Sequence, residues 1–398
     1  MDILKGKKII IGVTGSIAAY KIASLCSMLK KRAADVTVIM TQNATNFINP
    51  ITFETLTGNK CLIDTFDRNF QYDVEHVELA KVADVFLVAP ASANVIAKAA
   101  NGLADDMLTT TLLACTCPKL FSPAMNTRMF QNPITQDNLS KLSKYGMTVI
   151  SPASGYLACG DVGEGKMPEP EELLEHIIYA LTTKDLSGKN VLVTAGGTKE
   201  KLDPVRFITN NSSGKMGFAI ARAAHLRGAN VTLVYGNVSV PLPIGPNAIH
   251  IESAKDMADV IKESYRLQNI IIKAAAVADY TPATVSDQKI KKKDGDMSIP
   301  LDRTEDILGF LGKNRVDNQF LCGFSMETEN VLENSAAKLT KKNVDMIVAN
   351  SIATTGAGFG TDTNVVTFIT KDGNKELPLM SKDDVADAIL DEILSHLA

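Results

Sequence analysis

Residues 7–41, KKIIIGVTGSIAAYKIASLCSMLKKRAADVTVIMT, contain the pattern that decides the fold. An apolar, β-branched run over 7–15 is followed by apolar residues at helical spacing over 16–32 and by a second strand-like run over 35–41. A strand, a helix and a second strand in this order predict a βαβ unit, whose two strands are parallel.

The same alternation continues through the first half of the chain. Strand-like runs occupy residues 85–92, 119–125 and 147–152, and helical stretches such as 95–104 and 139–145 separate them. Strands that alternate with helices predict a parallel sheet with helices on both faces.

A polar segment at residues 183–190 interrupts this pattern, and VLVTAGG at 191–197 then restarts it. The later strand-like runs lie at residues 230–236, 270–278, 320–326 and 345–350. We therefore predict an α/β protein of two Rossmann-like domains, residues 1–183 and 184–398, each with a mostly parallel, doubly wound sheet.

Composition excludes several classes of protein. The 398 residues are 45% hydrophobic and 22% charged, without the roughly 20 consecutive apolar residues of a membrane span. The formal net charge of −4 argues against a nucleic-acid partner. The first residues enter a strand rather than a secretory signal, and the six cysteines lack paired spacing, so we expect a cytoplasmic protein with reduced thiols.

Small and polar residues follow the predicted strands of the first half. The turn with Gly15 and Ser16 joins a strand to a helix, where backbone N–H groups can bind a phosphate; glycine also serves such turns for steric reasons alone, so both interpretations stay open. The segment PASAN, which contains Ser92 and Asn94, lies at the carboxyl end of a strand, where parallel sheets bind ligands.

Three other residues of this half have both a structural and a functional interpretation. Asn126, in PAMNTRM, has the position of a helix cap. His76, considered alone, is typical of a partly exposed surface histidine. Cys159 lies in a glycine-rich stretch, which favours an exposed and functional thiol.

Taken together, VTGSIAAYK, PASAN, ADDMLTTTLLA, PAMNTRM and LACGDVGEGKM closely resemble the homo-oligomeric flavin-containing cysteine decarboxylases. The resemblance implies FMN as cofactor and His76, Asn126 and Cys159 as catalytic residues, with Cys159 as the acid, His76 as a base and Asn126 on the substrate carboxylate. The FMN-binding residues that it implies are Gly15, Ser16, Thr41, Ser92, Asn94 and Thr109.

The implied chemistry explains the need for a flavin. Loss of CO₂ from an N-acylated cysteine leaves a carbanion that has no electron sink. Two-electron oxidation of the cysteinyl CH₂–SH group by FMN gives a thioaldehyde, which can accept the electrons that CO₂ leaves behind. Return of the hydride to the resulting ene-thiol makes the cycle redox-neutral.

The second half has polar segments at its own strand ends. SSGKMG at residues 212–217 opens a helix, where it can receive a phosphate or act only as a cap; it is not a Walker A loop. Arg206 and Asn210 lie on the long loop before it, and Asp279 ends an apolar run. The lysine run that starts at Lys289 is, considered alone, typical of a solvated surface.

The segments TAGGTKEKLDPVRFITNNSSGKMG, AAVADYTP, KIKKK, GFSMETEN and KKNVDMIVAN resemble the phosphopantothenate–cysteine ligases. The resemblance implies CTP with Mg²⁺, an acyl-cytidylate that cysteine then attacks, and catalytic roles for Arg206, Asn210 and Lys289. It implies no metal ligand. The nucleotide-binding residues that it implies are Ala275, Asp279, Lys289, Asp306, Ile307, Phe324, Lys338 and Lys342.

The two resemblances imply consecutive reactions, because the ligase product, 4′-phosphopantothenoylcysteine, is the decarboxylase substrate. Family relatives suggest a homo-oligomer with trimeric decarboxylase and dimeric ligase contacts, such as a dodecamer. An inactive flavoprotein scaffold is an alternative, against which the presence of His76, Asn126 and Cys159 argues. An NAD-dependent oxidoreductase is another, but the full glycine fingerprint is absent.

Overall fold

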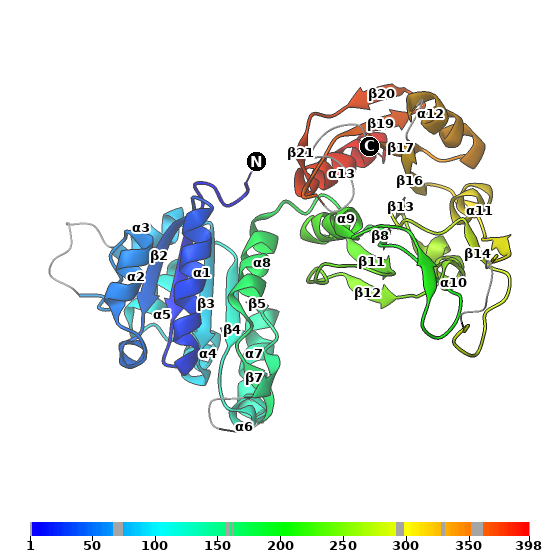
Figure 1. The fold of residues 1–398 in the computed structure, drawn as a ribbon. Coiled ribbons are helices and arrows are strands. Elements are labelled where there is room, and N and C mark those ends of the chain that lie inside the picture. Colours follow the sequence, from blue (N-terminus) through cyan, green and yellow to red (C-terminus); the bar gives the residue numbers. More distant parts are fainter. Residues whose placement is uncertain are drawn as a thin grey trace. The chain divides into compact units, whose positions relative to one another are not determined.

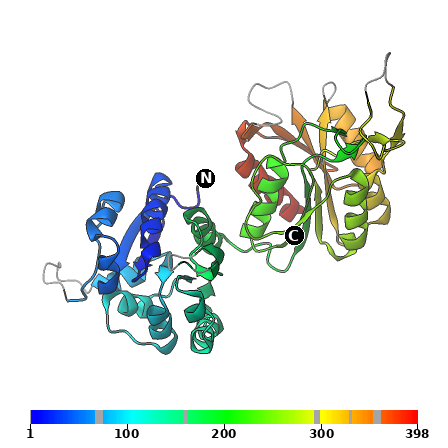
Figure 2. The same cartoon turned by 60° about the horizontal axis from the view of Figure 1, so that its bottom comes forward.

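The computed structural model describes residues 2–66, 75–156, 160, 162–291, 298–327, 331–351 and 361–397. The chain forms two compact units, Met1–Thr182 and Thr183–Ala398 (Figures 1 and 2). Each unit has its own central sheet and is described by itself.

The first unit contains a five-stranded, fully parallel sheet with the strand order β2-β1-β3-β4-β5. This order is that of the flavodoxin-like doubly wound fold, in which the chain reverses direction across the sheet between β1 and β3. The strands are β1 (Lys8–Val13), β2 (Asp35–Met40), β3 (Val85–Ala91), β4 (Lys119–Pro123) and β5 (Thr148–Val149).

Helices connect these strands, as the apolar periodicity predicts. They are η1 (Ile17–Ala19), α1 (Tyr20–Lys31), η2 (Gln42–Asn46), α2 (Pro50–Thr57), α3 (Glu75–Val82), α4 (Ala93–Asn101), α5 (Met107–Ala114), α6 (Thr127–Phe130), α7 (Pro133–Lys144) and α8 (Pro170–Leu181). A separate antiparallel hairpin of β6 (Ala153–Tyr156) and β7 (Val162–Lys166) lies in the glycine-rich stretch, where no strand was predicted.

The second unit is built on an eight-stranded sheet with the order β12-β11-β8-β13-β16-β17-β19-β20. The first six strands are parallel and have the Rossmann order, and the last two extend the sheet in antiparallel fashion. These strands are β12 (Asn247–His250), β11 (Asn230–Tyr235), β8 (Asn190–Ala195), β13 (Ile270–Lys273), β16 (Phe320–Glu327), β17 (Met346–Ser351), β19 (Val366–Thr370) and β20 (Gly373–Glu376).

Helices cover both faces of this sheet, and short strand pairs extend from its loops. The helices are α9 (Lys215–Leu226), α10 (Ala254–Ser264), η3 (Tyr265–Leu267), α11 (Ile307–Asn314), α12 (Val331–Lys342) and α13 (Lys382–Leu397). The short pairs are β9 (Lys199–Lys201) with β10 (Phe207–Thr209), β14 (Tyr280–Pro282) with β15 (Leu301–Arg303), and β18 (Thr363–Asn364) with β21 (Met380–Ser381).

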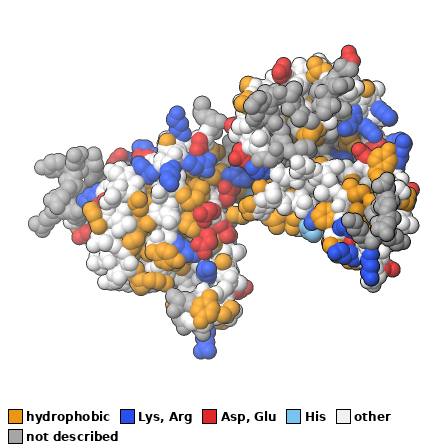
Figure 3. All heavy atoms as spheres, in the orientation of Figure 1, with side chains coloured by type: hydrophobic (Ala, Val, Ile, Leu, Met, Phe, Trp, Pro, Cys, Tyr) orange, Lys and Arg blue, Asp and Glu red, His pale blue; other side chains and the backbone are white. Residues whose placement is uncertain are grey.

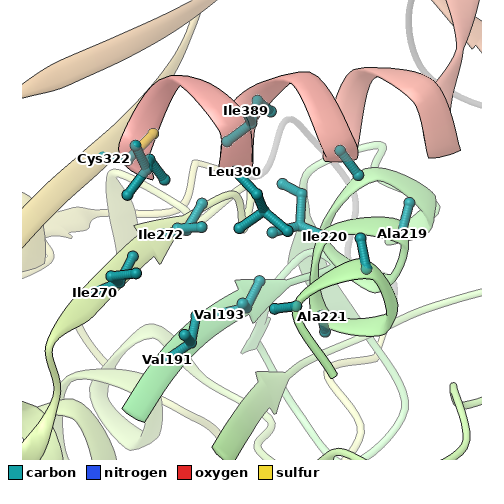
Figure 4. Packing of buried hydrophobic residues seen from close by; sticks show 14 of the residues in the cluster. Val191, Val193, Ala219, Ile220, Ala221, Ile270, Ile272, Cys322, Ile389 and Leu390 are labelled. Atoms are coloured by element: carbon teal, nitrogen blue, oxygen red, sulfur yellow. The ribbon is translucent and has the colours of Figure 1, made fainter. Parts of the chain in front are cut away.

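Alternate side chains of the strands supply two cores. On one face, Val191, Val193, Ile270 and Ile272 pack beneath α9 and α13, as Figure 4 shows. On the other face, residues such as Ile271 pack with α10, α11 and α12. Burial on both faces explains why the strands are continuous apolar runs.

The predicted α/β class and the two mostly parallel, doubly wound sheets are confirmed. The antiparallel strands β19 and β20 and the short strand pairs were not predicted. Within the described ranges, no helix is both long enough and apolar enough to cross a bilayer.

Candidate active sites

The predicted FMN-binding residues of the first unit meet at one edge of its sheet. Gly15 and Ser16 follow β1, Thr41 follows β2, and Ser92 and Asn94 follow β3. Since β2, β1 and β3 are adjacent and parallel, their carboxyl ends form one crevice at the point where the strand order reverses. The structure therefore brings these five residues to one edge.

Hydrogen bonds hold this edge together. The Thr14 hydroxyl donates to the Pro90 carbonyl oxygen at 2.6 Å and accepts from the Ser92 amide at 2.9 Å, which joins the ends of β1 and β3. Ser16 accepts from the Ala18 amide at 3.3 Å and caps η1. A Cβ atom at Gly15 would lie 3.0 Å from the Asn43 Cβ, so this turn packs closely against η2.

The hydroxyl groups of two predicted FMN-binding residues, Thr109 and Thr41, differ in their hydrogen bonds. The Thr109 hydroxyl is buried and donates to the Asp106 carboxylate at 2.8 Å, within the capping box of α5. The Thr41 hydroxyl is buried and has no hydrogen-bond partner among the described residues. A buried hydroxyl without a partner is costly, and a ligand oxygen at the crevice would satisfy it. The residues present therefore fit a polar cofactor such as FMN.

A cavity of about 330 Å³ lies beside this turn. Asn126 lines this cavity, and its side chain also accepts a hydrogen bond from the Arg128 amide at 2.9 Å. The same residue therefore caps α6 and faces the cavity. Lys21, which is buried, donates to the Met167 carbonyl oxygen at 3.2 Å and to Glu169 at 2.7 Å. This ion pair holds the pKa of the Glu169 carboxyl below its usual value.

The β6–β7 hairpin packs on the loop that carries Asn126. The Met125 amide donates to the Gly165 carbonyl oxygen at 3.1 Å, and a Cβ atom at Gly165 would lie only 2.3 Å from the Met125 oxygen. A Cβ atom at Gly163 would lie 2.6 Å from the Thr127 hydroxyl. Glycine is therefore required for this close approach. Cys159, between the two strands, lies outside the described residues.

His76 does not join this cavity within one chain. It lies in the first turn of α3 and is half-buried, and it is absent from the residues that line the cavity beside Asn126. Helices α3 and α6 lie well apart in the unit (Figure 1).

In the second unit, the carboxyl ends of β8 and β13 flank the reversal of strand order. A cavity of about 150 Å³ at this edge includes the start of α9, Ala275 after β13, and Phe324 on β16. Two lysines line it. Lys215 pairs with Asp362 at 2.6 Å, and the pKa of Lys382 is lowered by burial and then by the charge of Lys215. The cavity combines a helix start with positive charge, which suits a phosphate.

Asn210 lies beside this cavity, and Arg206 contacts the segment of Lys289. The buried Asp203 accepts from the Arg206 guanidinium at 2.9 Å and from the Ile290 amide at 3.1 Å, while Arg206 donates to the Ile290 carbonyl oxygen at 2.7 Å. The Asn210 side chain donates to the carbonyl oxygens of residues 276 and 277 at 3.2 and 3.1 Å. Arg206 therefore lies beside the Lys289 loop, and Asn210 beside Ala275.

The remaining predicted nucleotide-binding residues lie on the α11–α12 side of the sheet. Asp306 caps α11, Ile307 is buried behind it, and Lys342 pairs with Asp306. Lys338 donates to the Phe324 carbonyl oxygen at 3.4 Å. Asp279 lies on the exposed loop after β13, and its carbonyl oxygen accepts from the Thr304 amide at 3.0 Å.

Two charged residues of this site were not predicted. Asp203 organises the Lys289 loop, and the Arg206 guanidinium keeps the pKa of its carboxyl well below the usual value. Lys273 ends β13 and interacts electrostatically with Lys338, Asp306, Asp279 and Lys342. The sequence IIIK at residues 270–273 gives an indication of Lys273, because a single charged residue at the end of an apolar run indicates that the strand ends at the edge of the sheet. No group of three or more His, Cys, Asp and Glu side chains in the described part of the chain could hold a metal ion.

Comparisons with known proteins assign both units to families. Residues 2–182 match the model "Flavoprotein", and residues 186–397 match "DNA/pantothenate metabolism flavoprotein C-terminal domain". The Bacillus subtilis "Coenzyme A biosynthesis bifunctional protein CoaBC" is 48% identical over 395 residues, covering 98% of this chain and 97% of that protein.

Two solved structures resemble one unit each. The crystal structure of the C-terminal domain of a CoaBC protein is 44% identical and covers 54% of this chain and 98% of that one, with a TM-score of 0.47. A PPC decarboxylase mutant complexed with pantothenoylaminoethenethiol is 32% identical and covers 44% and 97%, with a TM-score of 0.40. The full-length identity and both family models lead to one conclusion: this chain belongs to the family of bifunctional coenzyme A biosynthesis enzymes.

Proposed function

We propose that the second unit joins cysteine to 4′-phosphopantothenate at the expense of CTP, and that the first unit decarboxylates the product to 4′-phosphopantetheine. The observation that carries this proposal is the presence of two separate strand-end sites, each lined by residues that match one of the two family patterns. The full-length similarity to CoaBC proteins supports the pairing of both steps in one chain.

In the first unit, FMN would lie in the crevice formed by Gly15, Ser16, Thr41, Ser92 and Asn94. When bound, FMN supplies a reversible two-electron acceptor for the cysteinyl group. The unpartnered Thr41 hydroxyl supports this location.

The catalytic residues of the first unit would act around the cavity beside this crevice. We assign the Asn126 amide to the substrate carboxylate, because Asn126 lines the cavity. We assign His76 the role of base and Cys159 that of the acid that protonates the substrate. The glycine contacts of the hairpin support the role of Cys159, because they hold the strand that follows it against the Asn126 loop.

In the second unit, the nucleotide would activate the carboxylate. A carboxylate is a poor electrophile, so its oxygen must be converted into a leaving group, here through an acyl-cytidylate that the cysteine amine attacks. Lys289, Lys338 and Lys342 would neutralise charge that develops on the departing pyrophosphate. The contacts of Asp203 support this role for Lys289, because they fix the backbone of the adjacent Ile290.

Arg206 and Asn210 would position the acyl group next to Ala275 and Asp279. The bonds from Asn210 to carbonyl oxygens 276 and 277 support this assignment. Mg²⁺ would enter with the phosphates of CTP and would act as a Lewis acid on them. We assign it no ligand from the chain.

We further propose that the chain works as a homo-oligomer, with trimeric decarboxylase contacts and dimeric ligase contacts. Helix α3, which carries His76, lies apart from helix α6, which Asn126 caps, so a neighbouring copy would have to complete the decarboxylase site. Large hydrophobic side chains are exposed on this unit beside the cavity, among them Tyr20 at 61% and Tyr156 at 73%. Figure 3 shows hydrophobic patches on the visible face of the unit.

Two substitutions test the proposal that the activities have separate sites. Cys159→Ser should reduce formation of 4′-phosphopantetheine by about 100-fold or more while pyrophosphate release continues, because the thiol serves only the protonation step. Lys289→Gln should reduce pyrophosphate release by about 100-fold and spare decarboxylation of pre-made phosphopantothenoylcysteine.

Each variant is the control for the other. Both are assayed with FMN bound, and released pyrophosphate and CO₂ are measured separately. Loss of both activities to the same degree in either variant would contradict two separate sites.

A further inference from the structure

Two cysteines of the first unit lie in the short segment that joins α5 to β4 (Figure 1). Cys115 directly follows α5, and its amide donates to the Thr111 carbonyl oxygen at 3.0 Å. Cys117 lies two residues before the start of β4. Because only Thr116 separates the two cysteines, their Cα atoms are at most about 7 Å apart, close to the separation that a disulfide spans. The length of chain between them therefore permits a bond between the two sulfur atoms.

The two side chains meet in the same part of the core. Cys115 is buried in the cluster that α5 forms with β3, and Cys117, which is half-buried, packs against this cluster. Their thiols are hydrogen-bonded to one another. The Lys119 ammonium group donates to the Cys115 carbonyl oxygen at 2.5 Å, which brings a positive charge beside the pair. The structure therefore holds two free thiols in contact and next to a cation.

The surroundings make the two thiols unequal. The hydrogen bond between them lowers the pKa of Cys117 and raises the pKa of Cys115. The charge of Lys119 also lowers the pKa of Cys117, whereas burial and the charge of Asp84 act in the opposite direction. Cys117 is thus the thiol that ionises more readily, and it is also the more exposed of the two. Since the thiolate is the nucleophilic form, Cys117 is the group that an oxidant meets first.

A second pair of cysteines in the same unit lacks these features. Cys26 and Cys61 are both buried and interact electrostatically, so they too are neighbours. Burial raises the pKa of each thiol to about 12, which keeps both protonated at neutral pH. Among the cysteines that the structure describes, Cys117 alone combines partial exposure with a lowered pKa.

The pair of Cys115 and Cys117 lies away from the FMN crevice. Cys117 precedes β4, and Asp84, whose charge acts on it, precedes β3 and pairs with Lys7 before β1 at 2.9 Å. The amino ends of these parallel strands form one edge of the sheet, whereas the crevice lies at their carboxyl ends. The proposed decarboxylation therefore makes no use of this pair.

We propose that Cys115 and Cys117 form a modification site, a dithiol that hydroperoxides oxidise reversibly to an intramolecular disulfide. This inference goes beyond the proposed function and does not depend on it. It gives the first unit a site of thiol oxidation that is separate from Cys159, the proposed catalytic acid.

Each step of this oxidation is balanced. The Cys117 thiolate attacks one peroxide oxygen and the O–O bond breaks, which gives a sulfenic acid and a hydroxide ion that takes up the proton lost by Cys117. The Cys115 sulfur then attacks the Cys117 sulfur, the S–O bond breaks, and the Cys115 proton leaves with the hydroxyl group as water. Two electrons pass from the sulfur atoms to the peroxide, which is reduced to water. A dithiol reductant reverses the change by thiol–disulfide exchange.

Peptide mapping tests the proposal directly. Trypsin releases Cys115 and Cys117 together on the peptide 99–119, whereas each of the other cysteines lies on a peptide of its own. The full-length, FMN-loaded protein is exposed to limiting hydrogen peroxide at neutral pH, free thiols are alkylated in denaturant, and the digest is analysed by mass spectrometry. Peptide 99–119 should lose two hydrogens and escape alkylation, and dithiothreitol should restore both thiols. The peptides of Cys26 and Cys61 should stay reduced.

Four variants separate the roles of the residues. Cys115→Ser should stop at the sulfenic acid of Cys117, which dimedone traps, and Cys117→Ser should leave Cys115 reduced. Lys119→Met should slow disulfide formation by about threefold to tenfold, because the thiolate loses a neighbouring positive charge. Cys61→Ser is the matched control, since it removes one thiol of the unreactive pair and should leave oxidation of peptide 99–119 unchanged.

Three results would overturn the inference. They are retention of both thiols in the wild-type peptide 99–119, equally rapid oxidation of the Cys26 and Cys61 peptides, and oxidation of Cys115 at the wild-type rate in Cys117→Ser. The last result would show that Cys117 is not the attacking thiol. Each of them would leave the proposed function intact, because that function is tested by the release of pyrophosphate and CO₂.

Discussion

Two threonines of the first unit whose hydroxyl groups are buried illustrate the site at the residue scale. Thr57 donates to the Phe53 carbonyl oxygen at 2.8 Å and accepts from the Asn59 amide at 3.2 Å. Thr41 has no such partner in the part of the chain that the structure describes. One hydroxyl therefore stabilises the fold, whereas the other is available to a ligand.

Thr41→Val should separate stability from cofactor binding. Without FMN, the variant should be at least as stable as the wild type, because it lacks a buried, unsatisfied hydroxyl. Its affinity for FMN should be about threefold to tenfold weaker. Thermal unfolding of the apoprotein and fluorescence titration with FMN measure the two effects.

Thr57→Val is the control for this prediction. It should destabilise the apoprotein by about 1 to 2 kcal/mol, because it removes two bonds that are made, and leave FMN affinity unchanged. Equal FMN affinity in Thr41→Val and the wild type would show that the Thr41 hydroxyl does not contact the cofactor.

Sequence patterns indicated some candidate site residues and missed others. Ser92 and Lys289 could be named as candidates because each lies in a short polar segment of the kind that loops at strand ends carry, and their roles remain predictions. Asp203 was missed because its contacts depend on a partner far away in the chain, namely Ile290. Such partners are known only once the chain has folded.

At the scale of elements, the β6–β7 hairpin is important because it packs on the loop that carries Asn126, a proposed catalytic residue. Gly163 and Gly165 allow β7 to contact the loop of Asn126. Gly165 also has a φ of 122°, which L-residues with a side chain rarely adopt. The hairpin was not predicted, because its glycine-rich strands lack the apolar alternation that indicates a strand.

Gly165→Ala should disturb the decarboxylase site specifically. The added methyl group would meet the Met125 carbonyl oxygen, so the hairpin must shift, and decarboxylation should fall by about 100-fold. Ligase activity should remain, because the second unit has its own core. Assays of pre-made phosphopantothenoylcysteine and of pyrophosphate release measure the two activities.

Gly102→Ala is the control for this substitution. Gly102 also has a positive φ, 68°, but a Cβ atom there would meet nothing within 4 Å. We expect it to cost about 1 kcal/mol of stability and to leave decarboxylation intact. Equal activity of the two variants would mean that the hairpin contact does not position catalytic groups.

At the scale of the whole molecule, contacts of the segment after residue 182 explain where the second unit begins. Both carboxylate oxygens of Asp185 accept hydrogen bonds from the Arg227 guanidinium, at 2.9 and 2.6 Å. Lys184 donates to the Leu226 carbonyl oxygen at 2.7 Å. Arg227 also pairs with Asp391 of α13 at 2.7 Å. The polar residues Lys184 and Asp185, at which the sequence pattern is interrupted, thus make contacts within the second unit.

The two sheets themselves were predictable, because their buried parallel strands are continuous apolar runs between helical segments. The antiparallel extension by β19 and β20 was not, since β20 is exposed along its whole length and has no apolar pattern. The two activities followed from motifs in each half.

The most direct test of two consecutive reactions in one chain uses the purified protein, with its flavin absorption recorded first. Phosphopantothenate, cysteine, CTP and Mg²⁺ are supplied together, and pyrophosphate and CO₂ are followed in the same reaction. We predict that both are released in equal final amounts as 4′-phosphopantetheine forms, and that omission of cysteine abolishes CO₂. Failure to release either product from a flavin-loaded protein would contradict the account.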